Sequence, residues 1–322
     1  MERKKKLLLF VSAALVTVML VAVVSSTLSS TSSTLGPTAQ SSGALLGTPT
    51  PIPGVIRTGM YIRIGVNKGG TFGVGKGTDP GTGFQYPIGP QFESLAIWWW
   101  GEGYAIFYKT LSPTGGWVDN KAYWWPSLGW PPKLPDCNLI PVGFASLRDD
   151  DNRAIIKATL NTADGALKLE FTFSFPKQQK YVLLETKITN LGEKGALRDV
   201  LYKRIVDWDI HQNTANSWTS DSHSAYASYI NTALEKVIEL SVSGYTPTEL
   251  GNLPAYVDLN AWDDIGPPPT RRPGEYDIQS HNSVLQFDGN AAIYYDLDEM
   301  TERTAKTVYT VYQAGWNFGL PG

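Results

Sequence analysis

Apolar and polar residues alternate along much of the chain beyond residue 53, and this pattern predicts β-strands. In residues 167–175 (LKLEFTFSF), every odd-numbered position is Leu or Phe, and every even-numbered position is polar. A period of two is typical of a strand with one face in a core and the other in water. Further strands are predicted at 181–189, 197–210, 224–230, 236–245, 284–287, 292–297 and 306–316.

Helical periodicity is confined to residues 298–305 (DEMTERTA), which predict a single helical turn. Strands without intervening amphipathic helices favour an antiparallel all-β fold over alternating βαβ units. We therefore predict one large antiparallel two-sheet sandwich, of the supersandwich kind, over residues 54–322. Two smaller sandwiches, divided near the Pro-rich stretch 130–141, are the alternative.

The first 53 residues follow a different pattern. Basic residues 3–6 precede 18 uncharged, almost wholly apolar residues from Leu7 to Val24, which is typical of an export signal. Because about 20 such residues span a bilayer, residues 1–26 predict either a cleaved signal peptide or a retained anchor helix that contacts the membrane through residues 7–24. Residues 27–53, rich in Ser, Thr and Pro, predict a disordered tether. The protein is thus expected to be extracellular or displayed at the cell surface.

Composition and charge exclude several classes of protein. Hydrophobic residues make up 42% of the chain, which excludes disorder for its bulk. Setting aside residues 2–6 leaves 23 basic against 29 acidic residues, and a negative body argues against nucleic-acid binding. The single Cys137 excludes a disulfide framework, and three histidines without metal-binding spacing argue against zinc. The glycine-rich stretch 64–83 lacks the Ser/Thr of a phosphate loop and predicts a hairpin region instead. No cofactor is predicted, apart from the calcium alternative described below.

Tryptophans gather in one part of the sequence, with seven of eleven between positions 98 and 130. Aromatic faces stack on apolar flats such as those of sugar rings, so an exposed group of tryptophans would form a binding platform. Packing across the sandwich, or contact with another protein, would use the same residues. The candidate ligand-binding residues are Trp98, Trp100, Trp124, Trp125 and Trp130.

Two aspartates flank a tryptophan in the segment IVDWDI, as Asp207, Trp208 and Asp209. In a strand their carboxylates would share one face, about 7 Å apart, a spacing that suits calcium if further oxygens converge. Pairing with Lys203 or Arg204 at a strand edge is one alternative. A catalytic role is another, because the spacing is near the lower end of that used by inverting glycosidases. We expect the aspartates at the end of a central strand, leaving the core there, with Trp208 packed opposite. If they are buried instead, each must be paired or bound to a cation.

Catalytic motifs are missing from the sequence, and we name no catalytic residue. No serine lies in a GxSxG elbow and no histidines have HExxH spacing. A glycosidase-like mechanism would need two carboxylates across a groove. The acidic residues nearest the tryptophans in sequence are Glu93, Glu102, Asp119 and Asp136, and none of them belongs to a motif.

The segment YVLLETKITNLGEKGALRDVLYKRIVDWD, residues 181–209, resembles a module of secreted bacterial and archaeal proteins. In that module a V-x-I-T-N strand leads into a YRR-VDWDI sequence, and a glycine segment like Gly65–Gly73 occurs upstream. The sequence departs from the module at HQNTANSW, residues 211–218. The resemblance implies a large β-sandwich of the mutarotase-like kind and export, and it implies no catalytic residue.

Two functional hypotheses follow. The leading one is an exported cell-surface β-sandwich, without enzymatic activity, that has a structural, adhesive or filament-forming role. Its partners would be cell-envelope components, glycans, or further copies of the chain whose extended N-terminal segment completes a neighbour's sheet. The alternative is a carbohydrate-binding or carbohydrate-active protein that uses the aromatic region from Trp98 to Trp130.

Overall fold

The computed structural model describes residues 53–75, 81–95, 101–124, 137–210, 216–220, 224–231, 236–245, 255–259, 285–287 and 290–315. All of these residues belong to one compact unit, residues 47–322. Its strands pair antiparallel throughout, and the short 3-10 helix η1 (Pro90–Phe92) is the one helix among the described residues. The predicted all-β antiparallel sandwich is confirmed.

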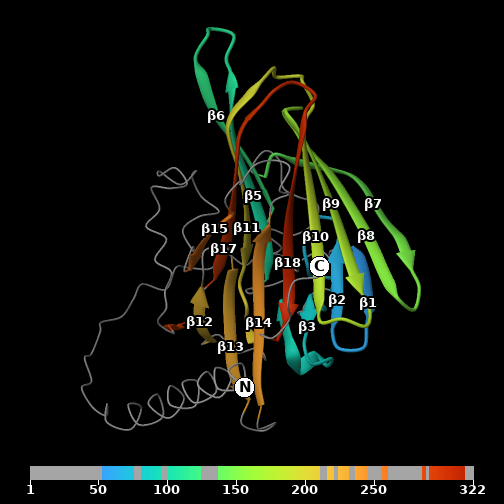
Figure 1. Cartoon of the computed structure of the whole chain (residues 1–322). Coiled ribbons are helices and arrows are strands. Elements are labelled where there is room, and N and C mark those ends of the chain that lie inside the picture. The colour runs from blue at the N-terminus through green and yellow to red at the C-terminus, as the bar shows by residue number, and fades with distance from the viewer. Residues whose placement is uncertain are drawn as a thin grey trace, which may run out of the picture. The chain divides into compact units, whose positions relative to one another are not determined.

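The largest sheet has nine strands, and the last strand of the chain lies near its middle (Figure 1). Here β18 pairs with β14 on one side and with β10 on the other. In spatial order the sheet comprises β16 (Leu285–Phe287), β12 (Asn216–Ser220), β13 (Ser224–Asn231), β14 (Lys236–Tyr245), β18 (Ala305–Ala314), β10 (Tyr181–Asn190), β9 (Leu167–Pro176), β8 (Arg153–Thr162) and β7 (Leu139–Asp149).

A five-stranded sheet packs against this one, with β11 (Leu197–Val206) at its centre. In sequence, β5 precedes residues 130–141 and β11 follows them, so this sheet pairs strands from both sides of the predicted dividing point. The remaining strands, taken outward from β11, are β5 (Glu102–Leu111) and β6 (Trp117–Trp124) on one side, and β17 (Ala291–Met300) and β15 (Ala255–Leu259) on the other.

A small four-stranded sheet completes the unit and carries the glycine-rich region. Residues 67–73 form a turn directly after β2 and fold back onto it, because Val66 bridges to Phe72 and Val74 bridges to Thr82. This agrees with the predicted hairpin region. The strands are β1 (Gly54–Thr58), β2 (Arg63–Asn67), β3 (Phe84–Gln85) and β4 (Glu93–Leu95).

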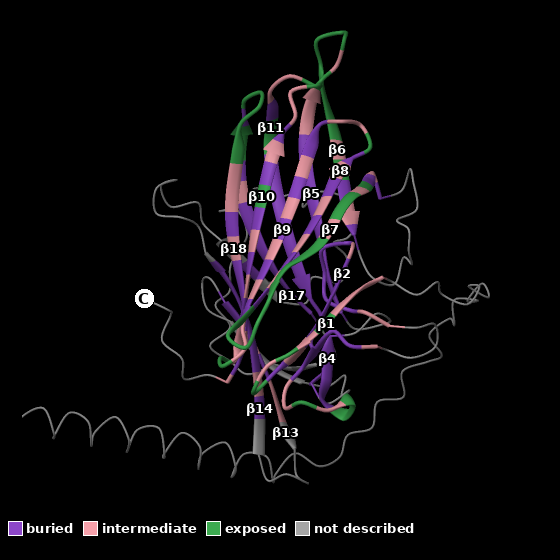
Figure 2. Cartoon of the chain, turned by 90° about the vertical axis from the view of Figure 1, so that its right-hand side faces the viewer, coloured by how far each residue is buried: buried purple, intermediate pink, exposed green. Residues whose placement is uncertain are grey.

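The core between the large sheets follows from the alternation in the sequence. On β9, the Leu and Phe side chains are buried and the intervening polar ones are partly exposed, as the striped colouring of Figure 2 shows. Tyr104 of β5 packs against Phe171 of β9 with ring centroids 4.7 Å apart and the rings tilted by 46°, which joins the two sheets. At the sheet edge, β7 is exposed along most of its length (Figure 2).

Strand β11 differs because it is buried on both faces. Tyr202 and Val206 belong to the main core, whereas Leu201 and Ile205 belong to a second apolar cluster with Ala105, Phe107, Ala292 and Tyr294. The inner face of the five-stranded sheet is thus the one that meets the nine-stranded sheet, and the outer face carries the second cluster.

Two helices were expected from the sequence, a turn at residues 298–305 and the apolar segment at residues 7–24. The helical turn predicted at 298–305 is wrong: β17 continues to Met300, a turn follows, and β18 starts at Ala305. Charged residues at a hairpin end imitate a helical pattern over so few residues. Within the described ranges no helix has the length and apolarity to cross a bilayer, and residues 7–24 lie outside those ranges.

Candidate functional site

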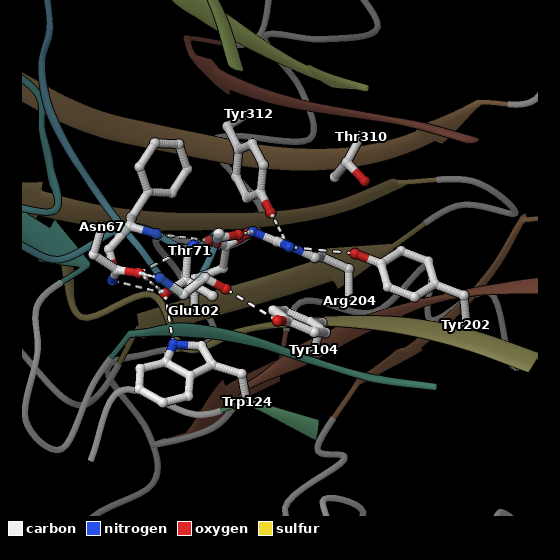
Figure 3. Close-up of polar contacts among 12 residues, drawn as sticks. Asn67, Thr71, Glu102, Tyr104, Trp124, Tyr202, Arg204, Thr310 and Tyr312 are labelled. Atoms are coloured by element: carbon white, nitrogen blue, oxygen red, sulfur yellow. Dashed lines mark hydrogen bonds and ion pairs between the residues drawn. The ribbon is translucent and has the colours of Figure 1, made fainter. Parts of the chain in front are cut away.

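A fully buried ion pair occupies the inner face of β11 (Figure 3). The guanidinium of Arg204 contacts the carboxylate of Glu102, which begins β5, and neither side chain is exposed. Arg204 also donates to Tyr312 Oη at 3.0 Å, to Tyr202 Oη at 3.2 Å and to the carbonyl oxygen of Gly70 at 2.8 Å. One side chain therefore joins the five-stranded sheet, β18 of the nine-stranded sheet, and the turn after β2.

That turn, residues 67–73, is organised by the buried side chain of Asn67. Its Nδ2 donates to Thr71 Oγ1 at 2.8 Å and to Gly73 O at 2.9 Å, while its Oδ1 accepts from Gly69 N at 2.8 Å. Thr71 Oγ1 also accepts the indole N–H of Trp124 at 3.1 Å. We call the set Asn67, Gly70, Thr71, Phe72, Glu102, Tyr104, Trp124, Tyr202, Arg204 and Tyr312 the Arg204 network.

Burial and mutual attraction act in opposite directions on the pKa values of this pair. Burial raises the pKa of Glu102, and the charge of Arg204 opposes that rise. Burial lowers the pKa of Arg204, but the carboxylate of Glu102 outweighs it and holds the pKa above its ordinary value. The second oxygen of Glu102 accepts the N–H of Phe72 at 2.9 Å. A buried pair with its remaining hydrogen-bonding capacity satisfied is the arrangement that a low-dielectric interior tolerates.

The outer face of the same strand carries a second charged group. Lys203 has no exposed surface, and its ammonium lies 5.0 Å from the ring centroid of Tyr294 on β17. Around it the sheet is lined by small residues, because Lys203 pairs with Ala105 and Ile205 pairs with Gly103 and Ala292. Lys203 is thus enclosed between an aromatic ring and a floor of Gly and Ala, and a cation held against an aromatic face is stabilised by the ring's quadrupole.

Asp207 and Asp209 follow directly where β11 ends. The N–H of Asp207 donates to Gly101 O at 2.8 Å, and the N–H of Asp209 donates to Ser94 O at 3.2 Å. Trp208 between them is fully buried in the main core, 5.4 Å from the ring of Phe84, as predicted. If the alternation of β11 continues past its last residue, the two carboxylates point away from the ring of Trp208.

The expectation that these carboxylates leave the core is wrong. Asp207 is 2% exposed and Asp209 is 4% exposed, because the main chain stays pinned to Gly101 and Ser94 beyond the end of the strand. For the calcium prediction, no three His, Cys, Asp or Glu side chains in the described ranges lie close enough to hold a metal ion. The two aspartates alone do not complete a calcium site. His211, the nearest histidine in sequence, lies outside those ranges.

The predicted tryptophan platform falls mostly outside the described residues, which do not include Trp98, Trp100, Trp125 and Trp130. Trp124 is described, and it is fully buried with its N–H on Thr71, so it presents no ring face to solvent. Trp117, at the tip of the β5–β6 hairpin, is 38% exposed, with the guanidinium of Arg198 4.5 Å from its ring centroid.

The carboxylates considered for catalysis are dispersed. Glu102 is held by Arg204, and Asp119 lies on the hairpin with 71% of its side chain exposed. Asp136 is outside the described residues. Glu93 is buried and accepts hydrogen bonds from Gly83 N, Phe84 N and Gln85 Nε2, each at 2.8 Å. Burial nevertheless raises the pKa of Glu93 to about 7.

Sequence reasoning missed both buried cations of β11. The signal was present: Lys203 and Arg204 interrupt an otherwise apolar central strand, where buried charges must be partnered. It also missed the contact between the two segments that resemble the secreted module. Gly70 O of the glycine segment accepts a hydrogen bond from Arg204, which lies in the segment leading to VDWDI.

The comparisons with known proteins return weak likenesses. No protein-family model matches the chain, and no curated protein matches it in sequence. A bacterial glucoamylase complexed with acarbose aligns over 85% of this chain with a TM-score of 0.46 and 9% identity. The chain spans about a third of that protein, 34% of its length.

Smaller proteins align over nearly their whole length. A putative aldose 1-epimerase from Escherichia coli K12 matches 82% of this chain and 99% of its own, with a TM-score of 0.38 and 9% identity. A protein from Synechocystis matches 84% and 99%, with a TM-score of 0.41 and 9% identity. With TM-scores below 0.5 and 9% identity, these likenesses assign the chain to no family.

Proposed function

We propose that this protein binds saccharides at the outer face of the five-stranded sheet, where β11 ends. The observation that carries the proposal is the burial of three charged side chains there: Lys203 over Tyr294, then Asp207 and Asp209. Buried clusters of ionisable side chains are more frequent at functional sites than elsewhere in a protein. Carboxylates and an ammonium beside an aromatic ring are suited to the hydroxyl groups and apolar flats of a sugar.

The predicted tryptophans extend this proposal. Trp100 immediately precedes Gly101, and Trp98 lies two positions before Trp100. The carbonyl oxygen of Gly101 accepts the N–H of Asp207, so the tryptophan-rich segment is continuous in sequence with the residue that holds the aspartate. We propose Trp98 and Trp100 as stacking residues of the same site, with Trp125 and Trp130 supplied by the segment that follows β6.

We propose binding rather than catalysis. A hydrolytic mechanism needs an acid and a base on opposite sides of a bond. Glu102 is occupied by Arg204, and both oxygens of Glu93 accept hydrogen bonds from neighbouring groups. Asp207 and Asp209 follow one strand, so they approach a ligand from the same side.

Binding to immobilised and soluble saccharides tests the proposal. The purified full chain is titrated calorimetrically with maltohexaose, cellohexaose and N-acetylchitohexaose, and screened on a glycan array. We expect binding to at least one saccharide class, and a loss of at least tenfold in affinity for Lys203→Met and Asp207→Asn. Asp119→Asn, on the exposed hairpin, is the control and should bind like the parent. No binding across the array would contradict the proposal.

A second candidate is self-assembly, which the exposed edge strand β7 favours. Ile140, Val142 and Leu147 are 41%, 53% and 60% exposed on the terminal strand of the nine-stranded sheet. Arg57 of β1 contacts Asp149 at the end of β7 at 2.9 Å, so the chain enters the fold beside this edge. We propose the N-terminal segment of a second copy as the added strand. Size-exclusion chromatography with and without residues 27–60 tests this; identical monomers would contradict it.

A further inference from the structure

We propose that the Arg204 network positions Asp207 and Asp209 at the outer-face site, so that the buried ion pair is a positioning device as well as a structural one. The ligand in this inference rests on the proposed saccharide function. The positioning itself rests on contacts of described residues. These contacts connect the ion pair on the inner face of the five-stranded sheet with the residues that follow β11.

The first connection is the ladder between β5 and β11. Glu102 pairs in register with Val206, and the next main-chain bond runs from Asp207 N to Gly101 O at 2.8 Å. Arg204 contacts the Glu102 carboxylate from two residues before Val206. The ion pair thus bridges the two strands just before the bond that holds Asp207.

The second connection runs through three aromatic rings. The N–H of Phe72 donates to Glu102, and the Phe72 ring lies 5.8 Å from that of Phe84. Phe84 in turn packs 5.4 Å from Trp208, the residue between the two aspartates. Arg204 bonds the turn through Gly70 O, and packing of Phe72 on Phe84 and of Phe84 on Trp208 connects that turn with the residue between the two aspartates.

The third connection reaches Asp209. Phe84 of β3 pairs with Leu95 of β4, and Ser94 O accepts the N–H of Asp209 at 3.2 Å. The two aspartate amides thus bond the residue directly before β5, which begins with Glu102 of the network, and Ser94 of β4. A planar guanidinium that bonds several groups at once sets their mutual geometry, which apolar side chains of equal volume do not do.

The test separates positioning from stability. In the full chain, the double variant Glu102→Met/Arg204→Met replaces the pair by apolar side chains, a change that buried pairs often tolerate without loss of stability. We measure thermal unfolding, hydrogen exchange of the 205–210 peptide, and binding of the three hexasaccharides named above. We expect a melting temperature close to that of the parent, at least fivefold faster exchange in 205–210, and at least tenfold weaker binding.

Thr310→Val is the matched control, because it removes a buried hydroxyl bonded to Tyr295 Oη at 2.9 Å without touching Arg204 or Glu102. It should leave exchange in 205–210 unchanged. If the double variant melts like the parent and also exchanges like it, the inference is overturned. If the parent binds none of the three saccharides, the proposed ligand fails while exchange still decides the positioning.

Should the double variant not fold, Arg204→Lys takes its place. Lysine keeps the charge opposite Glu102 but lacks the fork that reaches Gly70 O, Tyr202 and Tyr312 together. We expect faster exchange in 205–210 here as well, and parent-like exchange in this variant would overturn the inference.

Discussion

Lys203 and Arg204 are neighbours in the sequence, and both are fully buried on opposite faces of one sheet. Arg204 faces inward to Glu102, and Lys203 faces outward to the ring of Tyr294. Strand β11 therefore carries a structural charge and a candidate ligand-binding charge back to back. A substitution at Lys203 therefore tests the outer face and one at Arg204 tests the inner face, and each variant serves as a control for the other.

Removing one member of the Arg204–Glu102 pair should be costly. Arg204→Met or Glu102→Met leaves the other charge buried without its partner, and each should lower the free energy of unfolding by about 3–5 kcal/mol. The double variant should lose much less than the sum of the two. Urea unfolding of all four proteins measures the coupling. Strictly additive losses would mean that the two side chains do not stabilise each other.

Gly70 should be intolerant of a side chain. Its φ of +77° is costly for other residues, and an added Cβ would lie 2.3 Å from Phe171 Cδ2. We expect Gly70→Ala to cost about 3 kcal/mol or more, from backbone strain and overpacking together. Gly115→Ala is the control: its φ is +90°, but nothing lies within 4 Å, so about 1 kcal/mol is expected. Equal losses in chemical denaturation would show that packing on Phe171 is unimportant.

Glu93 should make stability depend on pH. Its folded pKa of about 7 lies above the ordinary value of 4.5, so folding favours the protonated carboxyl. The stabilisation is complete below pH 4.5 and is lost as pH rises through 7, by about 3 kcal/mol at 1.36 kcal/mol per unit. Glu93→Gln should remove this loss of stability, because an amide does not titrate. Rotation of the Gln85 amide lets Gln85 Oε1 accept a hydrogen bond from the new amide.

The measurement is urea unfolding of parent and Glu93→Gln at pH 5 and pH 8. The parent should lose more stability than the variant between the two values. If both respond equally, Glu93 is ionised in the folded protein at pH 5 and the expected shift is wrong.

The same substitution should differ sharply between the middle and the edge of the nine-stranded sheet. Leu169 on β9 is fully buried, and Leu169→Ala should cost about 2–5 kcal/mol. Leu147 on β7 is 60% exposed, and Leu147→Ala should change stability by no more than about 0.5 kcal/mol. Thermal unfolding of both variants measures the contrast. A large loss at Leu147 would indicate that β7 is covered in solution.

Strands β9 and β10 of the nine-stranded sheet were predictable because each has one buried face and one partly exposed face. On β9 and β10 the buried residues repeat every second position, so local pattern alone identifies them. For β11 the pattern conflicted, since Tyr202 and Val206 lie on one face and Leu201 and Ile205 on the other. Strand β11 is central and buried on both faces, so apolar residues occur at successive positions and no amphipathic alternation develops.

The candidate site was predictable only in part. The aspartates flanking Trp208 were identified from spacing, and so was the burial of Trp208. Their own burial was not, because the partners of their amides, Gly101 and Ser94, are more than 100 residues away in sequence. The ion pair of Arg204 with Glu102 has the same separation, and no local pattern reports it.

The place of β18 between β14 and β10 has a consequence for how the protein is made. Among the described strands, β18 alone hydrogen-bonds the two halves of the nine-stranded sheet to each other. Residues 305–314 follow every other described strand of this sheet in sequence, so the sheet cannot close until they have been synthesised. Until then β10 and β14 keep exposed edges that are prone to mispairing. Closure of the sheet thus depends on pairing between segments more than 100 residues apart in sequence, and such long-range pairing makes folding slow.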